Sequence, residues 1–261
     1  MGEEGGGYLS ARKRVRRAAN VVVRPAAQWT PAVHALLRHL DTVGFSGSPR
    51  LVGTGFDPDG QETIQFIEGE VDAKRVWSDD GIHELGRLLR ELHDATASFQ
   101  PPHDAAWQDS FLRSDSANAI CSHGDAAPWN VVTRQGRPVA LIDWEHAGPV
   151  DRLSELAYAG WLNAQLHDDY LAERQGLPSA EKRAHQLRLL VDGYGLSADD
   201  RAEFVTPLID VAILSCASDA IEAKITPESI DQEWLVWGVA WRARSAAWLV
   251  RHRGLLEGAL R

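Results

Sequence analysis

The feature that most constrains this chain is a predicted β-hairpin near its centre, with polar residues at both open ends. Two short apolar runs flank a segment whose Gly and Pro are typical of a tight turn. A type II′ turn centred on Gly136 and Arg137 would pair the strands so that Asn130 lies opposite Asp143. Facing residues in an antiparallel pair have Cβ atoms roughly 4.5–5.5 Å apart. The sequence therefore predicts an amide oxygen and a carboxylate that together can hold one hard cation.

A cation held by so few protein oxygens suits phosphoryl transfer, because Mg²⁺ bound in this way keeps coordination positions for substrate phosphates. Asp125 lies five residues before Asn130, and its carboxylate could accept the proton of an attacking hydroxyl. His123 is a second candidate for proton transfer, although a histidine in such a loop more often braces it through hydrogen bonds. The alternative for the whole segment is a surface hairpin in which the Asp and Asn are turn residues.

These residues resemble a known set. The order His-x-Asp-x-x-x-x-Asn, followed by an Asp after a short hairpin, is similar to the catalytic and metal-binding loops of the protein-kinase-like superfamily. The sequence Ile-Asp-Trp-Glu at residues 142–145 stands in place of the protein kinases' Asp-Phe-Gly. It resembles the aminoglycoside phosphotransferase and choline kinase family, whose members phosphorylate small molecules. The resemblance covers most of the chain and is strongest over residues 121–161.

The resemblance implies an α+β, bilobal, protein-kinase-like fold. A small antiparallel β lobe over residues 1–68 would bind the nucleotide, and a larger, mainly helical lobe over residues 69–261 would carry catalysis and substrate binding. The implied cofactors are ATP, with GTP possible, and Mg²⁺. The implied roles are catalysis by Asp125 and His123, metal binding by Asn130 and Asp143, nucleotide binding by Arg24, Gln65, Phe66 and Ile67, and substrate binding by Asp125, Glu145, Glu155 and Trp161.

Arg24 stands where the family's small lobe carries a phosphate-contacting lysine, as an arginine also does in choline kinase relatives. An arginine keeps the charge and can bind phosphate oxygens through two N–H groups. A solvated arginine at a strand edge is the alternative. The next helix, predicted to be capped by Thr30, lacks the family's glutamate that pairs with this cation, and it offers only His34, His39 and Asp41. Either another acid orients Arg24, or the ion pair is absent.

Two further strands are predicted over residues 51–56 and 62–67, on either side of an Asp-Pro-Asp-Gly turn. Residues 65–70 resemble the family's hinge between the lobes, where adenine hydrogen-bonds to backbone groups. A strand followed by a surface loop describes the same residues equally well.

The rest of the chain is predicted to be helical. An apolar stripe at helical spacing indicates a long helix from Ser78 to near Phe99, and helices are expected throughout after Glu155. The last of them, over residues 231–253, carries a stripe of tryptophans, a pattern more typical of a core than of a ligand site.

Charge and apolar patterning exclude several classes of protein. The net charge of −10 argues against a nucleic-acid partner, despite a basic run at residues 12–17. No apolar run approaches the roughly 20 residues that a membrane span needs, and the acidic, Gly-rich start does not resemble a signal peptide. Two cysteines far apart favour reduced thiols. We therefore expect a cytoplasmic monomer or homodimer without a membrane partner.

The sequence, with its resemblance, predicts an ATP-dependent phosphotransferase that modifies a hydroxyl of a small molecule. An antibiotic is the favoured acceptor, with aminoglycosides before nucleoside or macrolide antibiotics, and resistance is the expected biological role. Residues 155–233 hold fifteen Asp and Glu against six Lys and Arg, and acids that converged beside Asp125 would attract a cationic acceptor. The alternatives are a metabolic kinase for choline, a sugar or an amino alcohol, and a catalytically silent kinase-like module that binds a nucleotide.

Overall fold

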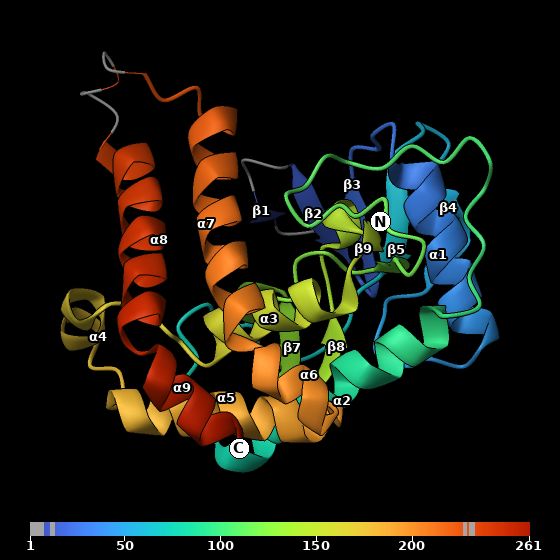
Figure 1. The fold of residues 1–261 in the computed structure, drawn as a ribbon. Coiled ribbons are helices and arrows are strands. Elements are labelled where there is room, and N and C mark those ends of the chain that lie inside the picture. The colour runs from blue at the N-terminus through green and yellow to red at the C-terminus, as the bar shows by residue number, and fades with distance from the viewer. Residues whose placement is uncertain (1–7, 11–13, 227–228, 230–232) are drawn as a thin grey trace.

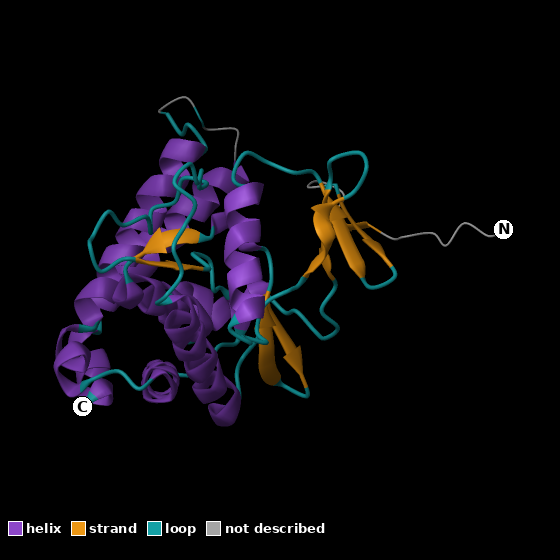
Figure 2. Ribbon diagram, turned by 90° about the vertical axis from the view of Figure 1, so that its right-hand side faces the viewer, coloured by secondary structure: helices purple, strands orange, loops and turns teal. Residues whose placement is uncertain are grey.

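The computed structural model describes residues 8–10, 14–226, 229 and 233–261, and it combines a small antiparallel sheet with a larger helical part (Figure 1). Figure 2 shows the five-stranded sheet at one edge of the molecule and most of the helices at the other. The sheet has the order β1-β2-β3-β5-β4, and its strands are β1 Tyr8–Ser10, β2 Val15–Ala18, β3 Val21–Arg24, β4 Leu51–Phe56 and β5 Glu62–Gln65. The predicted boundary at residue 68 stays a prediction.

Helix α1, Thr30–Thr42, packs its apolar stripe into the core beside this sheet. Val33, Leu36, Leu37 and Leu40 are all buried, as their helical spacing predicts. The predicted cap is wrong, because Trp29 occupies the cap position and the helix already begins at Thr30. The Thr30 hydroxyl instead accepts a hydrogen bond from the backbone N–H of Ala27.

Six short elements lie between α2 and α3 in the described chain. They are the strands β6 Ile120–Ser122 and β9 Gly148–Val150, the hairpin of β7 Val131–Arg134 and β8 Arg137–Leu141, and the 3₁₀ turns η1 Pro128–Asn130 and η2 Trp144–His146. The helices are α2 Asp79–Thr96, α3 Arg152–Asn163, α4 Asp169–Gln175, α5 Ala180–Tyr194, α6 Ala198–Glu203, α7 Val205–Glu222, α8 Glu233–Arg251 and α9 Arg253–Leu260. No helix in the described part of the chain is long and apolar enough to cross a membrane.

Helices α2 and α5 cross with their backbones in contact, because glycines lie at the crossing. A Cβ added at Gly86 of α2 would lie 2.0 Å from the carbonyl oxygen of Leu190, and one at Gly193 of α5 would lie 1.9 Å from that of His83. No other residue type fits such a close approach. Ser78 caps α2 by accepting the N–H of Gly81, as the predicted start of this helix requires.

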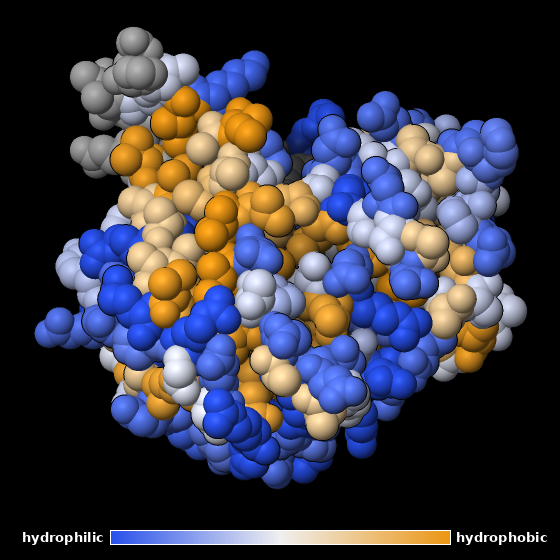
Figure 3. Space-filling view, viewed as in Figure 1, coloured by the Kyte–Doolittle hydropathy of each residue, from blue (hydrophilic) through white to orange (hydrophobic). Residues whose placement is uncertain are grey.

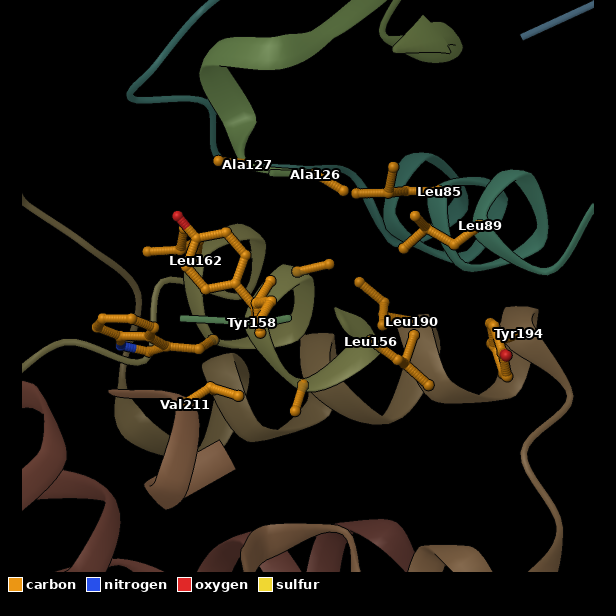
Figure 4. Packing of buried hydrophobic residues seen from close by; sticks show 14 of the residues in the cluster. Leu85, Leu89, Ala126, Ala127, Leu156, Tyr158, Leu162, Leu190, Tyr194 and Val211 are labelled. Carbon is orange, nitrogen blue, oxygen red and sulfur yellow. The ribbon is translucent and has the colours of Figure 1, made fainter. Parts of the chain in front are cut away.

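The core lies beneath the loop that follows β6. Figure 4 shows Ala126 next to Leu85 of α2, with Tyr158 and Leu162 of α3 below Ala127 in this view, and all of them belong to one buried cluster. Both alanines are fully buried. The two residues that follow Asp125 are therefore anchored in the core, which gives the loop a rigid base.

The helix predicted over residues 231–253 corresponds to α8, Glu233–Arg251, and a further short helix, α9 Arg253–Leu260, follows it. Its tryptophan stripe is only partly core: Trp248 is fully buried, whereas Trp237 is 40 % exposed. Helices α7 and α8 stand side by side and project from the body (Figure 1). Hydrophobic residues gather over these two helices on the face seen in Figure 3.

Candidate active site

The β7–β8 hairpin exists, but its turn lies one residue earlier than predicted. The strands pair Arg134 with Arg137, so the turn residues are Gln135 and Gly136. Their φ angles are 53° and 75°. Positive φ at both central residues belongs to a type I′ turn, not to the predicted type II′ turn.

This register moves the polar residues at the open end of the hairpin. The backbone N–H of Ile142 donates to the carbonyl oxygen of Asn130 at 2.9 Å, so these two residues face one another. The prediction that Asn130 lies directly opposite Asp143 is wrong by one residue. A bulge between Val132 and Thr133 also shifts the pairing, and neither feature has a strong sequence signal.

Asp125 is held by three side chains that point hydrogen-bond donors at its carboxylate. Asn130 donates through Nδ2 at 2.7 Å, the Tyr158 hydroxyl at 3.0 Å and the Trp129 indole N–H at 3.4 Å. Burial raises the pKa of Asp125, and the bonds from Tyr158 and Trp129 act in the opposite direction without outweighing burial. The result is a desolvated carboxylate in a fixed orientation, which can accept a proton from a group beside it.

His123 braces this loop and is not placed to carry protons. Its Nε2 lies 2.8 Å from the carbonyl oxygen of Ile142, and its Nδ1 accepts the backbone N–H of Asp125 at 3.2 Å. Both ring nitrogens are therefore used by the backbone, in the neutral tautomer. Burial lowers the pKa of His123, which favours the same neutral state. This corrects the expectation that His123 shares the catalytic role.

Glu155 fixes the same loop from beneath. It accepts the backbone N–H of Gly124 at 2.6 Å and contacts Nε2 of His93 at 2.7 Å. Burial would raise the pKa of Glu155, but its hydrogen bonds and the charge of His93 outweigh burial and lower it. Glu155 and Trp161 are both 0 % exposed, so neither side chain faces an acceptor. This corrects the prediction that they bind substrate, and both support the site from within the core.

Arg24 joins the small sheet to the catalytic loops. Its Nη1 donates to Oδ1 of Asp143 at 2.8 Å, and its Nε donates to Glu62. Burial alone would lower the pKa of Arg24, but the charges of Glu62, Asp143 and Glu145 raise it. Of the two predicted alternatives, the first is therefore found: Arg24 is oriented by another acid, and the solvated strand edge is excluded because the side chain is 14 % exposed.

The residues predicted to bind a metal offer the right chemistry. Asn130 donates through Nδ2 to both the side chain and the backbone of Asp125, which leaves its amide oxygen for a cation. Asp143 adds a carboxylate, and oxygen donors of this kind are those that Mg²⁺ prefers. Within the residues described, no group of three or more His, Cys, Asp or Glu could hold a metal ion. A Mg²⁺ ion bound by one amide oxygen and one carboxylate would keep coordination positions for phosphate oxygens.

The predicted hinge is fastened to its neighbours on both sides. The backbone N–H groups of Gln65 and Phe66 donate to the carbonyl oxygens of Arg50 and Asn20. They are therefore not free to bind adenine. Ile67 is half-buried, and its N–H makes no backbone hydrogen bond within the described residues. Of the three predicted nucleotide contacts in this segment, Ile67 is the one that could offer a donor.

Comparison with known proteins places these residues in a wider context. A family model described as "Phosphotransferase enzyme family" matches residues 104–188, which include Asp125, Asn130 and Asp143. A protein named trifolitoxin immunity protein, from Rhizobium leguminosarum bv. trifolii, is 52 % identical over 250 residues, and the match covers 95 % of each chain.

Several solved kinase structures share the fold. An amicoumacin kinase in complex with AMP-PNP and Ca²⁺ has a TM-score of 0.63 at 13 % identity, covering 93 % of this chain and 90 % of that one. A microcompartment-associated aminopropanol kinase has a TM-score of 0.60 at 14 % identity, covering 95 % and 90 %. The GDP complex of an aminoglycoside 2′-phosphotransferase has a TM-score of 0.56 at 14 % identity, covering 95 % and 91 %. These matches confirm the predicted fold class.

Proposed function

Since the chain belongs to the phosphotransferase enzyme family, we propose that it transfers the γ-phosphoryl group of ATP, or of GTP, to a hydroxyl group of an antibiotic. The observation that carries this proposal is the 2.8 Å contact between Arg24 and Asp143. It joins a cation of the small sheet to a carboxylate at the end of the β7–β8 hairpin, close to the loop of Asp125. Phosphoryl transfer requires a cation that binds the phosphates, a carboxylate that can hold a metal ion, and a general base.

In this mechanism Asp125 accepts the proton of the acceptor hydroxyl as its oxygen attacks the γ-phosphorus, and the bond between that phosphorus and the bridging oxygen breaks to release ADP or GDP. Asn130 and Tyr158 hold the carboxylate in place, while His123 and Glu155 hold its loop. Arg24 binds phosphate oxygens and offsets the negative charge that is redistributed during transfer. Asn130 and Asp143 would hold Mg²⁺, which supplies further charge neutralisation at the phosphates when it is bound.

The side chains around Asp125 bear on which class of acceptor the site could bind. Its carboxylate is flanked by the aromatic side chains of Trp129 and Tyr158. At least five of the fifteen acids over residues 155–233 are already engaged within the described chain. The contacts are Glu155 with His93, Asp168 with Arg244, Asp169 with Trp248, Asp192 with Arg201 and Asp219 with Arg242. We therefore do not restrict the acceptor to cationic aminoglycosides, and we place neutral, partly aromatic antibiotics beside them.

The trifolitoxin immunity protein is named for protection against a toxin, and this supports a role in resistance over a role in metabolism. We place this activity in the cytoplasm, in a monomer or a homodimer. Cys121 and Cys216 are both free, which suits a reducing compartment.

The decisive experiment is a screen of ADP release from ATP in the presence of Mg²⁺. The panel pairs kanamycin, amicoumacin and chloramphenicol with choline, ethanolamine and simple sugars. We expect release with an antibiotic and little with the metabolites. Release with a metabolite alone would favour a metabolic kinase, and nucleotide binding without release under any acceptor would favour a silent module.

A further inference from the structure

We propose that Glu62 and His34 are positioning residues for Arg24, and that together they replace the helix glutamate whose absence the sequence reveals. The inference rests on the proposed function, because it concerns how the phosphate-binding cation of that reaction is aimed. Glu62 opens β5, and His34 lies on α1. No catalytic contact is assigned to either residue.

The pairing of strands β3 and β5 places Arg24 beside Glu62. Arg24 and Glu62 are direct partners in the antiparallel register of β3 and β5. Directly facing side chains in such a pair are neighbours whatever the rest of the fold does. The Nε of Arg24 donates to Oε2 of Glu62, which is 1 % exposed. The ion pair is thus set by the register of the small sheet.

The other carboxylate oxygen of Glu62 has a partner as well, which is His34. Nε2 of His34 lies 3.0 Å from Oε1 of Glu62, and the His34 side chain is 0 % exposed. Burial would raise the pKa of Glu62, but the hydrogen bonds of His34 and Arg24 and the charge of Arg24 outweigh burial and lower it. Glu62 is therefore an ionised carboxylate with both oxygens engaged, which leaves it one orientation.

The residues around the His34 ring confine it. Gly55 has a φ of +93°, and a Cβ there would lie 2.6 Å from Cε1 of the His34 ring. The ring of Phe56 lies on another side, with centroids 4.7 Å apart. His34 Nδ1 is buried without a hydrogen-bond partner in the described part of the chain. The imidazole is therefore confined by packing, and its single polar contact is with Glu62.

Together these contacts fix the plane of the guanidinium group. A planar guanidinium that is held at Nε by Glu62 and at Nη1 by Asp143 has little freedom to turn. In protein kinases the equivalent pair depends on where a helix sits. Here the acid lies on the neighbouring strand, so the pairing of Arg24 with Glu62 is set by the sheet, while His34 of α1 holds the other oxygen of Glu62.

The test compares Glu62→Gln with Glu91→Gln as the matched control. Glu91 pairs with Arg87 on the surface of α2 and is 57 % exposed. We expect Glu62→Gln to lower kcat/KM for ATP by roughly 10- to 100-fold, because a misplaced binding group lowers the rate of a reaction by about that factor. The control should stay within about twofold. His34→Gln, which keeps a donor for Glu62, should restore most of the activity that His34→Leu loses.

A double-mutant cycle with Arg24→Ala, measured both as kcat/KM and as ATP affinity, separates positioning from general damage. If Glu62 acts through Arg24, the Glu62→Gln change has little further effect once Arg24 is removed. Additive losses, or a Glu62→Gln enzyme as active as the control, would overturn the inference. A wild-type chain that binds ATP without turnover would refute the proposed function alone, since the coupling in affinity would still report on Arg24. Thermal unfolding of each variant identifies any loss of fold, and Glu62→Asp supplies a variant that keeps the charge if Glu62→Gln is unstable.

Discussion

Replacing Tyr158 with phenylalanine should move the acidic limb of the pH–rate profile to higher pH. The hydroxyl of Tyr158 donates to Oδ1 of Asp125 at 3.0 Å. Burial, together with the nearby Asp125 carboxylate, raises the pKa of Tyr158 well above its usual value, so the phenol stays protonated and remains a donor. Losing a hydrogen bond to the charged form raises the pKa of a carboxyl group.

The size of the shift follows from the strength of that bond. A hydrogen bond to a charged group contributes about 1.5–3 kcal/mol, and one pKa unit corresponds to about 1.4 kcal/mol. A length of 3.0 Å lies at the long end of O–H···O distances, so we take the lower figure and expect a shift of about one unit. Because a general base must be ionised, kcat/KM should then fall about tenfold at pH values below the limb and stay unchanged on the plateau.

The measurement is kcat/KM against pH, from a coupled assay of ADP release. Phenylalanine keeps the edge-to-face contact of Tyr158 with Phe111, whose centroids are 5.3 Å apart, so the fold should survive. Trp129→Phe is the matched comparison: its bond to Asp125 is longer, at 3.4 Å, and a smaller shift is expected. A limb that stays in place in Tyr158→Phe, or that moves to lower pH, would refute the assignment of Asp125 as the base.

Three further changes test other parts of the site and fold. Asp125→Ala should reduce turnover by a factor of about 10²–10⁴ while ATP affinity is retained. Asp143→Ala should also abolish Mg²⁺-dependent nucleotide binding, which calorimetry measures. Near-full activity of Asp125→Ala would contradict the mechanism. Arg24→Ala should raise KM for ATP or lower kcat, with Arg24→Lys intermediate because the charge survives without the planar fork; steady-state kinetics decide this, and no change in either variant would remove Arg24 from the site. Gly86→Ala should lower the free energy of unfolding by about 1–3 kcal/mol or more, since its Cβ would meet the carbonyl of Leu190 at 2.0 Å, while Gly258→Ala, with nothing within 4 Å, should be neutral or mildly stabilising in thermal unfolding.

The general plan of the fold could be predicted because local signals agreed with one another. The apolar stripe of α1 and the start of α2 at Ser78 were both found where the sequence placed them. The hairpin was predicted to exist, but not its register, because a glutamine at positive φ carries little sequence signal. A one-residue change in register is invisible to composition and alters which residues face one another.

The site was predicted less completely because some of its parts meet only in three dimensions. Glu62 was seen only as a strand residue, since nothing in the sequence says that its strand lies beside that of Arg24. The strand pairing supplies this, through the facing positions of the two residues. Tyr158 was missed for a similar reason: it reaches Asp125 from a helix 33 residues further along the chain. Glu155 and Trp161 were predicted to bind substrate because sequence position does not report burial.

The backbone conformation of Asp143 lowers the stability of the fold, whereas its side chain serves the proposed activity. Its φ and ψ are 61° and 62°, in the left-handed region. Glycine adopts this region freely, and other residues pay roughly 1–2 kcal/mol, with Asp and Asn among the more tolerant. A glycine at position 143 would relax the backbone and remove the carboxylate that contacts Arg24. Laboratory evolution for heat resistance alone would therefore favour an inactive chain at this position, and only a selection that also demands activity would keep the aspartate.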